Sequence, residues 1–187
     1  RKADLAGKNI MITAGPTREY IDPVRFVSNP SSGKMGYALA GAARDRGARV
    51  VLVSGPTALR PPSGVQVIPV TTTAEMLAAV LEHFPEMDVV IKAAAVVDYR
   101  PQTTAEQKLK KGSDKLVLTL ERNPDILKLL GERKGDKILV GFAAETQSLV
   151  ENAREKIKAK NLDLIVANDV GQRGAGFGTD TNIATII

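Results

Sequence analysis

The chain has 187 residues, which suits one domain of about 100 to 200 residues and leaves little room for two. Hydrophobic residues make up 43% and charged residues 25%, the balance of a soluble globular protein, and this excludes a disordered chain. There is no cysteine, so thiol catalysis, cysteine-ligated zinc and iron–sulfur clusters are excluded. The lone histidine, His83, excludes a multi-histidine metal site and favours a packed or solvated side chain over a catalytic triad member.

The net charge of +5 fits either a nucleic acid or an anionic small molecule as partner. Aromatic residues are only 4% and are scattered, which disfavours single-strand stacking, so we expect no nucleic-acid partner. No apolar run approaches the roughly 18 residues of a membrane span, and the first residues lack a secretory signal. We therefore expect a cytoplasmic protein without a membrane partner.

Short apolar runs alternate with segments of helical period along the whole chain. Strands are predicted at residues 9–14, 49–55, 65–70, 88–95, 116–121, 137–145 and 162–169, and helices at residues 34–47, 72–84, 123–133 and 148–161. Strands joined through helices favour a parallel sheet with helices on both faces. The sequence thus predicts one α/β domain, residues 1–187, with a Rossmann-like three-layer fold and a mainly parallel sheet.

Three helix starts carry recognisable capping residues. Thr72 with Glu75, and Ser148 with Glu151, have the spacing of a capping box. Asn123–Pro124 combines a good capping residue with proline at the first helical position. These signals set the predicted starts of the last three helices.

The loop at residues 14–36 is the first candidate for a binding site, because sheets of this class bind ligands beyond the carboxyl ends of their strands. It is several times longer than a usual loop and ends in Ser32 and Gly33 at a helix start, where an anion could bind. Ser28 and Met35 break the P-loop pattern, and the dinucleotide glycine motif is incomplete. The alternative is a helix start packed closely on the sheet.

Two more groups of candidates lie near the same ends of the strands. One group of polar residues recurs at intervals of about four: Arg18, Asp22, Arg25 and Asn29. The guanidinium of an arginine can bind carboxylate or phosphate through two hydrogen bonds, and the asparagine amide can both donate and accept. The alternative is a set of solvated loop charges. The segment 93–101 combines three alanines, which leave room for a flat ring, with an aspartate; here the alternative is close helix packing.

Lysines form the last group. Residues 108–111, KLKK, concentrate positive charge in a loop, and Lys156 and Lys160 lie one turn apart on a predicted helix face. For the second pair the alternative is simple compensation of the helix dipole.

Six segments together resemble the bacterial phosphopantothenoylcysteine synthetase family, over residues 7–180 and in the same order. They are ITAGPTREYIDPVRFVSNPSSGKMG, KAAAVVDYRP, QKLKK, NPDIL, VGFAAET and AREKIKAKNLDLIVANDV. The resemblance implies a CTP-dependent ligase that activates 4′-phosphopantothenate as an acyl-cytidylate and couples it to cysteine, releasing pyrophosphate and CMP. It also implies a domain excised from a bifunctional coenzyme A biosynthesis protein, whose other half is a flavin-dependent decarboxylase.

The resemblance further implies roles for individual residues. The residues that correspond to those acting on the acyl-cytidylate are Asn29, Arg25 and Lys108. The residues that correspond to nucleotide contacts are Lys92, Ala93, Ala94, Asp98, Lys108, Pro124, Asp125, Ile126, Leu127, Phe142, Lys156 and Lys160, with Ser32 and Gly33 as further candidates. Two positions depart from the family pattern: Lys92 replaces a small residue, and Gln107 stands where a glutamate is frequent.

The family is dimeric, and the alternating run at residues 116–121 is the expected dimerisation strand, next to a flexible loop. Mg²⁺ is expected with the nucleotide, held mostly by its phosphates, and no metal ligand is assigned. Two alternative functions remain open from the residues themselves: an NAD(P)-binding oxidoreductase, although residues 49–55 end without the acidic residue that binds ribose, and a non-catalytic nucleotide-binding domain.

Overall fold

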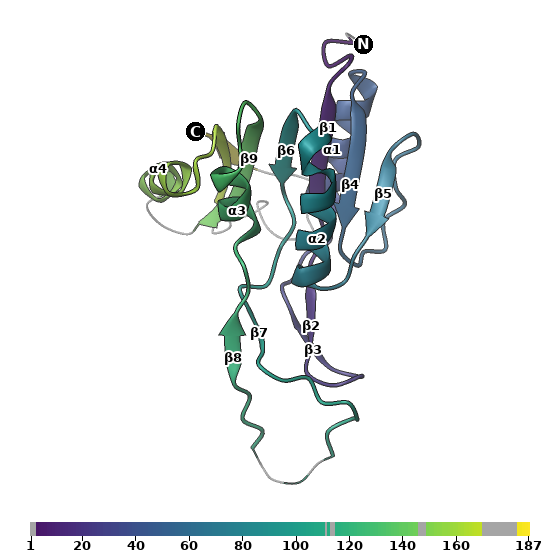
Figure 1. Cartoon of the computed structure of the whole chain (residues 1–187), viewed down its shortest axis with the longest axis vertical. Coiled ribbons are helices and arrows are strands. Elements are labelled where there is room, and N and C mark those ends of the chain that lie inside the picture. Colours follow the sequence, from purple (N-terminus) through teal and green to yellow (C-terminus); the bar gives the residue numbers. More distant parts are fainter. Residues whose placement is uncertain (1–2, 111, 113–114, 146–148, 170–182) are drawn as a thin grey trace.

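The computed structural model describes residues 3–110, 112, 115–145, 149–169 and 183–187. Among these residues, seven strands form one sheet in the order β11-β10-β9-β6-β1-β4-β5 (Figure 1). The strands are β1 (Asn9–Ala14), β4 (Arg49–Ser54), β5 (Gln66–Pro69), β6 (Val89–Lys92), β9 (Ile138–Glu145), β10 (Leu164–Asp169) and β11 (Ala184–Ile186). All neighbours pair in parallel except β10 and β11, which confirms the predicted mainly parallel sheet.

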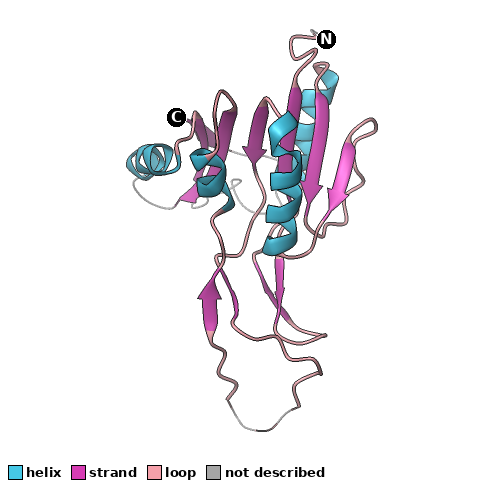
Figure 2. Ribbon diagram, viewed as in Figure 1, coloured by secondary structure: helices cyan, strands magenta, loops and turns pink. Residues whose placement is uncertain are grey.

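Helices cover both faces of this sheet, as Figure 2 shows. They are α1 (Lys34–Asp45), α2 (Thr73–His83), α3 (Ile126–Glu132) and α4 (Leu149–Lys160), with a short 3-10 helix, η1 (Phe84–Glu86), after α2. One buried cluster lies between α1 and the sheet and includes Ile12 and Leu52. The other lies under α2, α3 and α4 and includes Met76, Leu130 and Leu139. The predicted three-layer arrangement is therefore confirmed.

The helix caps agree with the sequence at α2 and differ at α3. Thr72 accepts from the Glu75 N–H, and the Glu75 side chain accepts from the Thr72 N–H, so the predicted capping box is present. The helix predicted from residue 123 begins instead at Ile126, with Asp125 as its capping residue. The prediction for Asn123 was wrong because its side chain is used in a buried network described below. The capping box of Ser148 lies outside the described residues.

The strand order reverses between β1 and β6. From β1 the chain moves to β4 and β5, then returns to β6 on the other side of β1. The two central strands continue to pair beyond their ends, through a bridge between Pro16 and Ala95. The carboxyl ends of β1 and β6 are thus the switch point at which a sheet of this class binds its ligand.

Both strands at the switch point lead into a projection that we call the arm. It consists of two small antiparallel sheets, β2 (Arg18–Tyr20) with β3 (Phe26–Ser28), and β7 (Tyr99–Pro101) with β8 (Leu120–Arg122). Figure 1 shows the arm extending from the carboxyl ends of the parallel strands.

The arm is where the sequence prediction of strands was least accurate. The strand predicted at 116–121 is wrong in position: the ladder covers Leu120–Arg122, opposite β7. Leu116 and Val117 are instead exposed, at 59% and 87%. The three-residue strands β2, β3 and β7 were not predicted, because a period of two cannot be recognised in so few residues.

A buried polar network joins the arm to the sheet domain. Asn123 donates through Nδ2 to Val97 O (2.8 Å), Glu19 Oε1 (3.3 Å) and Thr73 Oγ1 (3.3 Å). Glu19 Oε1 also accepts from the Thr73 N–H at 2.9 Å, and Thr17 Oγ1 accepts from the Val97 N–H at 3.0 Å. The network links β2, the end of β8, the segment after β6 and the start of α2, so it fixes how the arm leaves the sheet.

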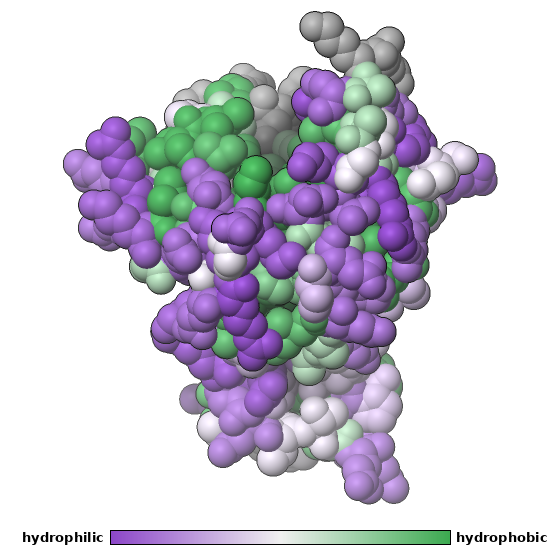
Figure 3. Space-filling view, turned by 45° about the horizontal axis from the view of Figure 1, so that its top comes forward, coloured by the Kyte–Doolittle hydropathy of each residue, from purple (hydrophilic) through white to green (hydrophobic). Residues whose placement is uncertain are grey.

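The surface of the molecule is mixed in character. Figure 3 shows hydrophilic residues over most of one face, with hydrophobic residues gathered toward its upper left. Exposed large apolar side chains occur at Ile138, Leu164 and Ile186 in the sheet and at Leu116 and Val117 in the arm. Within the described residues, no helix is both long enough and apolar enough to cross a membrane.

Candidate functional site

The backbone after β6 is held firmly against the loop after β1. The Ala93 N–H donates to Thr13 O at 3.2 Å, and the Ala94 N–H donates to Thr13 Oγ1 at 3.2 Å. The Ala95 N–H donates to Gly15 O at 2.9 Å. These three donors are used within the protein, so a ligand at this point would not be bound by these N–H groups.

Asn29 lies where the arm leaves the sheet domain, a region that we call the neck and that includes Ser28, Asn29 and Val96. It directly follows β3, and its Nδ2 donates to Val96 O, three residues beyond Ala93, at 3.0 Å. The preceding Ser28 anchors the same backbone by donating through Oγ to Thr17 O at 2.7 Å. Asn29 itself is exposed. The structure therefore brings Asn29 to the switch point, beside the alanine segment.

Charged side chains gather on the α3 and α4 side of the switch point. Lys160 Nζ lies 2.8 Å from Asp125 Oδ2, and Asp125 Oδ1 caps α3 by accepting from the Lys128 N–H at 3.1 Å. Burial works to raise the pKa of Asp125, but the hydrogen bond to Lys160 and the Lys128 N–H hold this pKa below its usual value. The half-buried Lys92 has a lowered pKa, because of its burial and then of the charge of Lys160, against the opposing charges of Asp125 and Asp98.

A glycine lets α4 approach α3 closely enough to form this cluster. A Cβ on Gly131 would lie 1.9 Å from Lys160 O, which no side chain could tolerate. Asn161, at the end of α4, in turn donates through Nδ2 to Gly131 O at 3.0 Å. This close approach positions Lys160 beside Asp125. Lys156 lies one turn earlier on α4 and is half-buried.

Several other predicted nucleotide contacts differ in how far their side chains are exposed. Ile126 and Leu127 are buried in the core, so only their backbone groups could reach a ligand, whereas Pro124 is exposed. Phe142 stands between Gly141, which faces the core under α3, and Ala143, which belongs to that core. Because side chains alternate along a strand, Phe142 points to the opposite face of the sheet.

The start of α1 shows the close packing on the sheet that was one of the two alternatives for this sequence. Gly33 has a φ of 77° and no side chain caps the helix at this residue, while Ser32 Oγ accepts from the Lys34 N–H at 3.4 Å. A Cβ on Gly36 would lie 2.4 Å from the Ala14 Cβ, so this glycine serves the close packing of α1 on β1. Anion binding by Ser32 and Gly33 remains a prediction.

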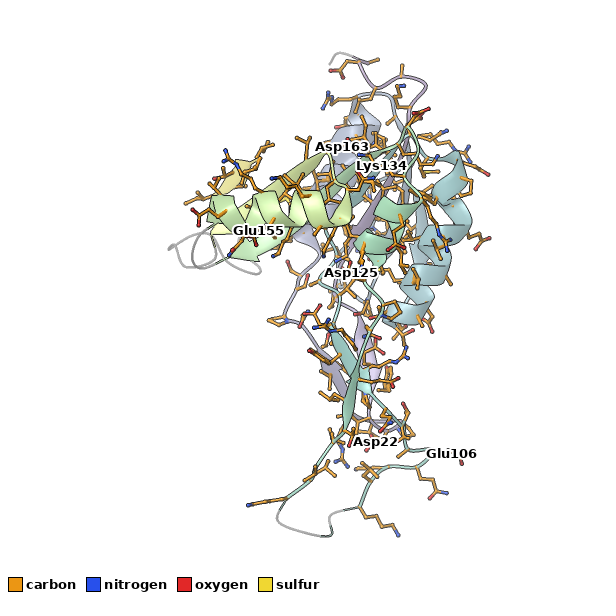
Figure 4. The ribbon with its side chains drawn as sticks, turned by 60° about the vertical axis from the view of Figure 1, so that its left-hand side comes forward. Asp22, Glu106, Asp125, Lys134, Glu155 and Asp163 are labelled. Carbon is orange, nitrogen blue, oxygen red and sulfur yellow. The ribbon has the colours of Figure 1, made fainter. Side chains whose placement is uncertain are left out.

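The third group of predicted residues lies in the arm. Arg25 Nε lies 3.3 Å from Asp22 Oδ2, and Arg25 Nη2 donates to Leu109 O at 2.6 Å. Leu109 follows Lys108, which is exposed. Figure 4 shows Asp22 in the part of the arm that is distant from the sheet, and Asp125 beside the sheet. Within one chain, Arg25 therefore contacts the backbone next to Lys108, and both residues lie apart from Lys160.

Two further observations concern metal-ligating side chains and the lone histidine. Among the described residues there is no group of three or more histidine, aspartate or glutamate side chains that could hold a metal ion. The ring of His83 faces its own helix, with Nδ1 3.0 Å from Ala79 O, which fits the packed histidine expected from the sequence.

Sequence reasoning missed the residues that support the site. Asn123 was expected to cap a helix and Glu19 was not singled out, yet both are buried in the joint of the arm. Asp22 was selected as one of four spaced polar residues, but its contact with a loop 87 positions away is invisible in a single sequence.

The sequence of the chain is similar to that of known proteins of one family. Residues 5–187 match the family model "DNA/pantothenate metabolism flavoprotein C-terminal domain". The chain is 59% identical over 185 residues to the coenzyme A biosynthesis bifunctional protein CoaBC of Bacillus subtilis, covering 98% of this chain and 46% of that protein. The chain thus spans about half the length of the curated relatives it matches.

Solved structures agree with the sequence comparison. The crystal structure of a CoaBC C-terminal domain aligns with a TM-score of 0.84 and 50% identity, covering all of this chain and 83% of the other. A mutant of Cab2 in complex with phosphopantothenate-cysteine aligns with a TM-score of 0.75 at 20% identity, covering 86% of this chain and 72% of the other, and so shows a shared fold. The chain belongs to the family of DNA/pantothenate metabolism flavoprotein C-terminal domains.

Proposed function

We propose that the chain is a phosphopantothenate–cysteine ligase that uses CTP. In the first step the carboxylate of 4′-phosphopantothenate attacks the α-phosphate of CTP, which forms an acyl-cytidylate and releases pyrophosphate. In the second step the amine of cysteine attacks the acyl carbon, and CMP leaves as the amide forms. The main support is the 59% identity to a CoaBC protein over nearly the whole chain.

The chemistry requires both activation and charge neutralisation. A carboxylate is a poor acyl electrophile because its leaving group would be oxide, and a phosphoryl group supplies a better one. Charge that develops on the attacked phosphate must then be stabilised by cations or hydrogen-bond donors. Asn29, at the neck, would hold the mixed anhydride, since an amide can bond its oxygens without adding charge. Arg25 and Lys108 would supply positive charge.

The nucleotide would bind on the sheet side of the neck. Lys160 and Lys156 would face its phosphates, and the backbone of Lys92 would lie beside the nucleotide. The remaining proposed nucleotide contacts are Ala93, Ala94, Asp98, Pro124, Asp125, Ile126, Leu127 and Phe142, with Ser32 and Gly33. The preference for CTP rests on the family resemblance. Mg²⁺ would accompany the phosphates, and we assign no step to it.

We further propose that the chain acts as a homodimer that uses its arm. Support comes from the exposed apolar side chains of the arm, among them Leu116, Val117 and Leu120. These lie in β8 or shortly before it, and the ladder of β8 has one partner, β7, among the described residues. We also propose the cytoplasm as the location and a flavin-dependent decarboxylase as the fused partner, since the matching CoaBC proteins are bifunctional and about twice as long.

The proposed function is tested by mixing the chain with CTP, Mg²⁺, 4′-phosphopantothenate and cysteine, and measuring CMP and pyrophosphate. We expect CMP to form only when cysteine is present, and pyrophosphate to form without cysteine in an amount close to that of the enzyme. Absence of CMP from a folded, dimeric sample would reject the ligase. Binding of CTP without turnover would favour a non-catalytic nucleotide-binding domain.

A further inference from the structure

Asp22 is a fully buried carboxylate in the turn between β2 and β3. Its Oδ1 accepts from the Val24 N–H and the Arg25 N–H, both at 2.8 Å. The Ile21 N–H donates to Arg25 O at 2.8 Å across the same turn. One carboxylate oxygen is therefore fully occupied in closing a local turn, as aspartate does in many loops.

The other oxygen makes contacts that the turn does not need. Asp22 Oδ2 accepts from the Leu109 N–H at 3.1 Å and lies 3.3 Å from Arg25 Nε. Arg25 Nη2 in turn donates to Leu109 O at 2.6 Å. Both backbone polar groups of Leu109 are thus held, one by Asp22 and the other by Arg25.

The chain before Leu109 follows the same hairpin. Thr104 Oγ1 donates to Tyr20 O at 2.9 Å, and the Ala105 N–H donates to Ile21 O at 2.9 Å. Leu109 lies between Lys108 and Lys110, which are both exposed. Two exposed lysines are therefore attached to a backbone position that is fixed on both sides.

Because the carboxylate of Asp22 is buried, its contacts have consequences for its charge. Desolvation works to raise the pKa of Asp22, but the N–H groups of Val24, Arg25 and Leu109 hold the pKa below its usual value. Asp22 is therefore ionised at neutral pH, accepts charge-assisted hydrogen bonds from the Arg25 and Leu109 N–H groups, and forms an ion pair with the Arg25 side chain.

We propose that Asp22 is a positioning residue that joins Arg25 and the lysine segment, residues 108–110, into one unit. This inference rests on the proposed function, in which Arg25 and Lys108 act on the anionic reactants. A lysine on a free loop must lose conformational entropy each time it reaches the reacting phosphate, whereas a backbone held at Leu109 has already been restrained. Asp22 therefore raises the rate of activation without touching substrate.

The substitution Asp22→Asn separates this role from the turn. An asparagine can keep its oxygen toward the Val24 and Arg25 N–H groups, which are the nearer pair of donors. Its amide nitrogen then replaces Oδ2 and faces two donors, the Leu109 N–H and Arg25 Nε. The variant thus preserves the turn and breaks the connection to the lysine segment.

Asp4→Asn is the matched control. Asp4 also receives two hydrogen bonds from an arginine, Arg46, at 2.8 and 2.9 Å, but it lies outside the arm, and both side chains are exposed. Limited trypsin digestion of the native chain, followed by mass spectrometry, measures cleavage after Lys108 and Lys110. We expect Asp22→Asn to be cleaved there several-fold faster than wild type, and Asp4→Asn to match wild type.

Turnover supplies the second measurement. Asp22→Asn should lower kcat for CMP formation by about tenfold, the effect of misplacing a group at the reacting centre, and leave KM for cysteine unchanged. Faster cleavage with unchanged kcat would overturn the positioning role, and unchanged cleavage would overturn the connection itself. If wild type forms no CMP, the proposed function fails, while digestion still decides whether Asp22 holds the segment.

A third measurement uses wild type alone and does not depend on any variant folding. In hydrogen exchange, the Leu109 amide should be protected, since it donates to a buried carboxylate, while the Lys110 amide exchanges faster. Equal exchange at the two amides would overturn the proposal.

Discussion

The sheet domain and the arm are stabilised by different interactions. The sheet domain packs two apolar clusters on its central strands, where residues such as Met11 and Leu52 are completely buried. The arm has three-residue strands and is held by polar contacts, chiefly those of Glu19, Asn123 and Asp22. Burial of apolar area is non-directional, whereas hydrogen bonds fix distance and angle.

This difference matches the tasks that the two regions would have. The nucleotide contacts proposed for Lys156 and Lys160 lie on a helix packed against the sheet, and a rigid scaffold suits the binding of a large ligand. Arg25 and Lys108 lie in the arm, whose backbone is held at particular points, as at Leu109. The arm is therefore ordered where its charged residues are needed, although little apolar surface is buried there.

The largest expected effect tests the contrast in packing. Leu139→Ala removes a completely buried side chain under α3 and should lower the free energy of unfolding by about 2 to 5 kcal/mol. Leu116→Ala makes the same chemical change at a residue that is 59% exposed, and should change the stability of the isolated chain by about 0.5 kcal/mol or less. Urea denaturation below the dimer dissociation constant measures both. Similar losses of stability in the two variants would contradict the proposed difference in packing between the sheet domain and the arm.

The next effect concerns Asn29, which we propose holds the mixed anhydride. Asn29→Asp should lower CMP formation by about 100- to 1,000-fold, close to the loss of one oxyanion donor, because it adds negative charge beside the developing phosphate charge. Gln102→Glu is the control, since it makes the same change at an exposed residue of the arm. Wild-type turnover in Asn29→Asp would remove Asn29 from the mechanism.

A smaller effect tests the buried polar network that joins the arm to the sheet domain. Asn123→Ala deletes the donor shared by Val97 O, Glu19 and Thr73 and should cost about 1 to 3 kcal/mol, because it leaves buried acceptors unpaired. Asn9→Ala removes one exposed hydrogen bond, to Glu86 O, and should cost less. Thermal unfolding monitored by circular dichroism compares the two. An equal loss for both variants would argue against a stabilising joint.

The smallest effect is a pH dependence at the edge of the sheet domain. Burial opposes the ionisation of Asp163, but hydrogen bonds from Lys134 and the Leu139 N–H hold its pKa below the usual 3.8. A lowered folded-state pKa stabilises the protein fully above about pH 5, and this stabilisation is lost as the pH falls through the folded pKa. Urea midpoints of wild type and Asp163→Asn should therefore converge as the pH is lowered from 6 to 3. Curves that stay parallel would contradict the assignment.

Most of the sheet domain could be predicted from the sequence, and most of the arm could not. Runs such as residues 9–14 and 49–55 bury nearly every side chain in the parallel sheet, so their apolar character alone identifies them. The arm depends on pairs that are distant along the chain, such as Asp22 with Leu109, and single-sequence patterns carry no information on them. Asn123 shows the same limit, since its capping signal was outweighed by tertiary hydrogen bonds.

The candidate site, too, could be predicted only in part from the sequence. The resemblance to a known family directed attention to Asn29 and Lys160, and the structure explains their local setting through contacts with Val96 and Asp125. The resemblance did not indicate which of the two faces of the sheet Phe142 would occupy. Which face a strand residue occupies follows from register, and register depends on the neighbouring strands.

The most direct test of this division of tasks is a crystal structure of the chain with CTP. We predict that the nucleotide lies at the carboxyl ends of β1 and β6, with its phosphates between Lys160 and the neck at Asn29. A nucleotide bound at another edge of the sheet, or held by the arm alone, would contradict the account.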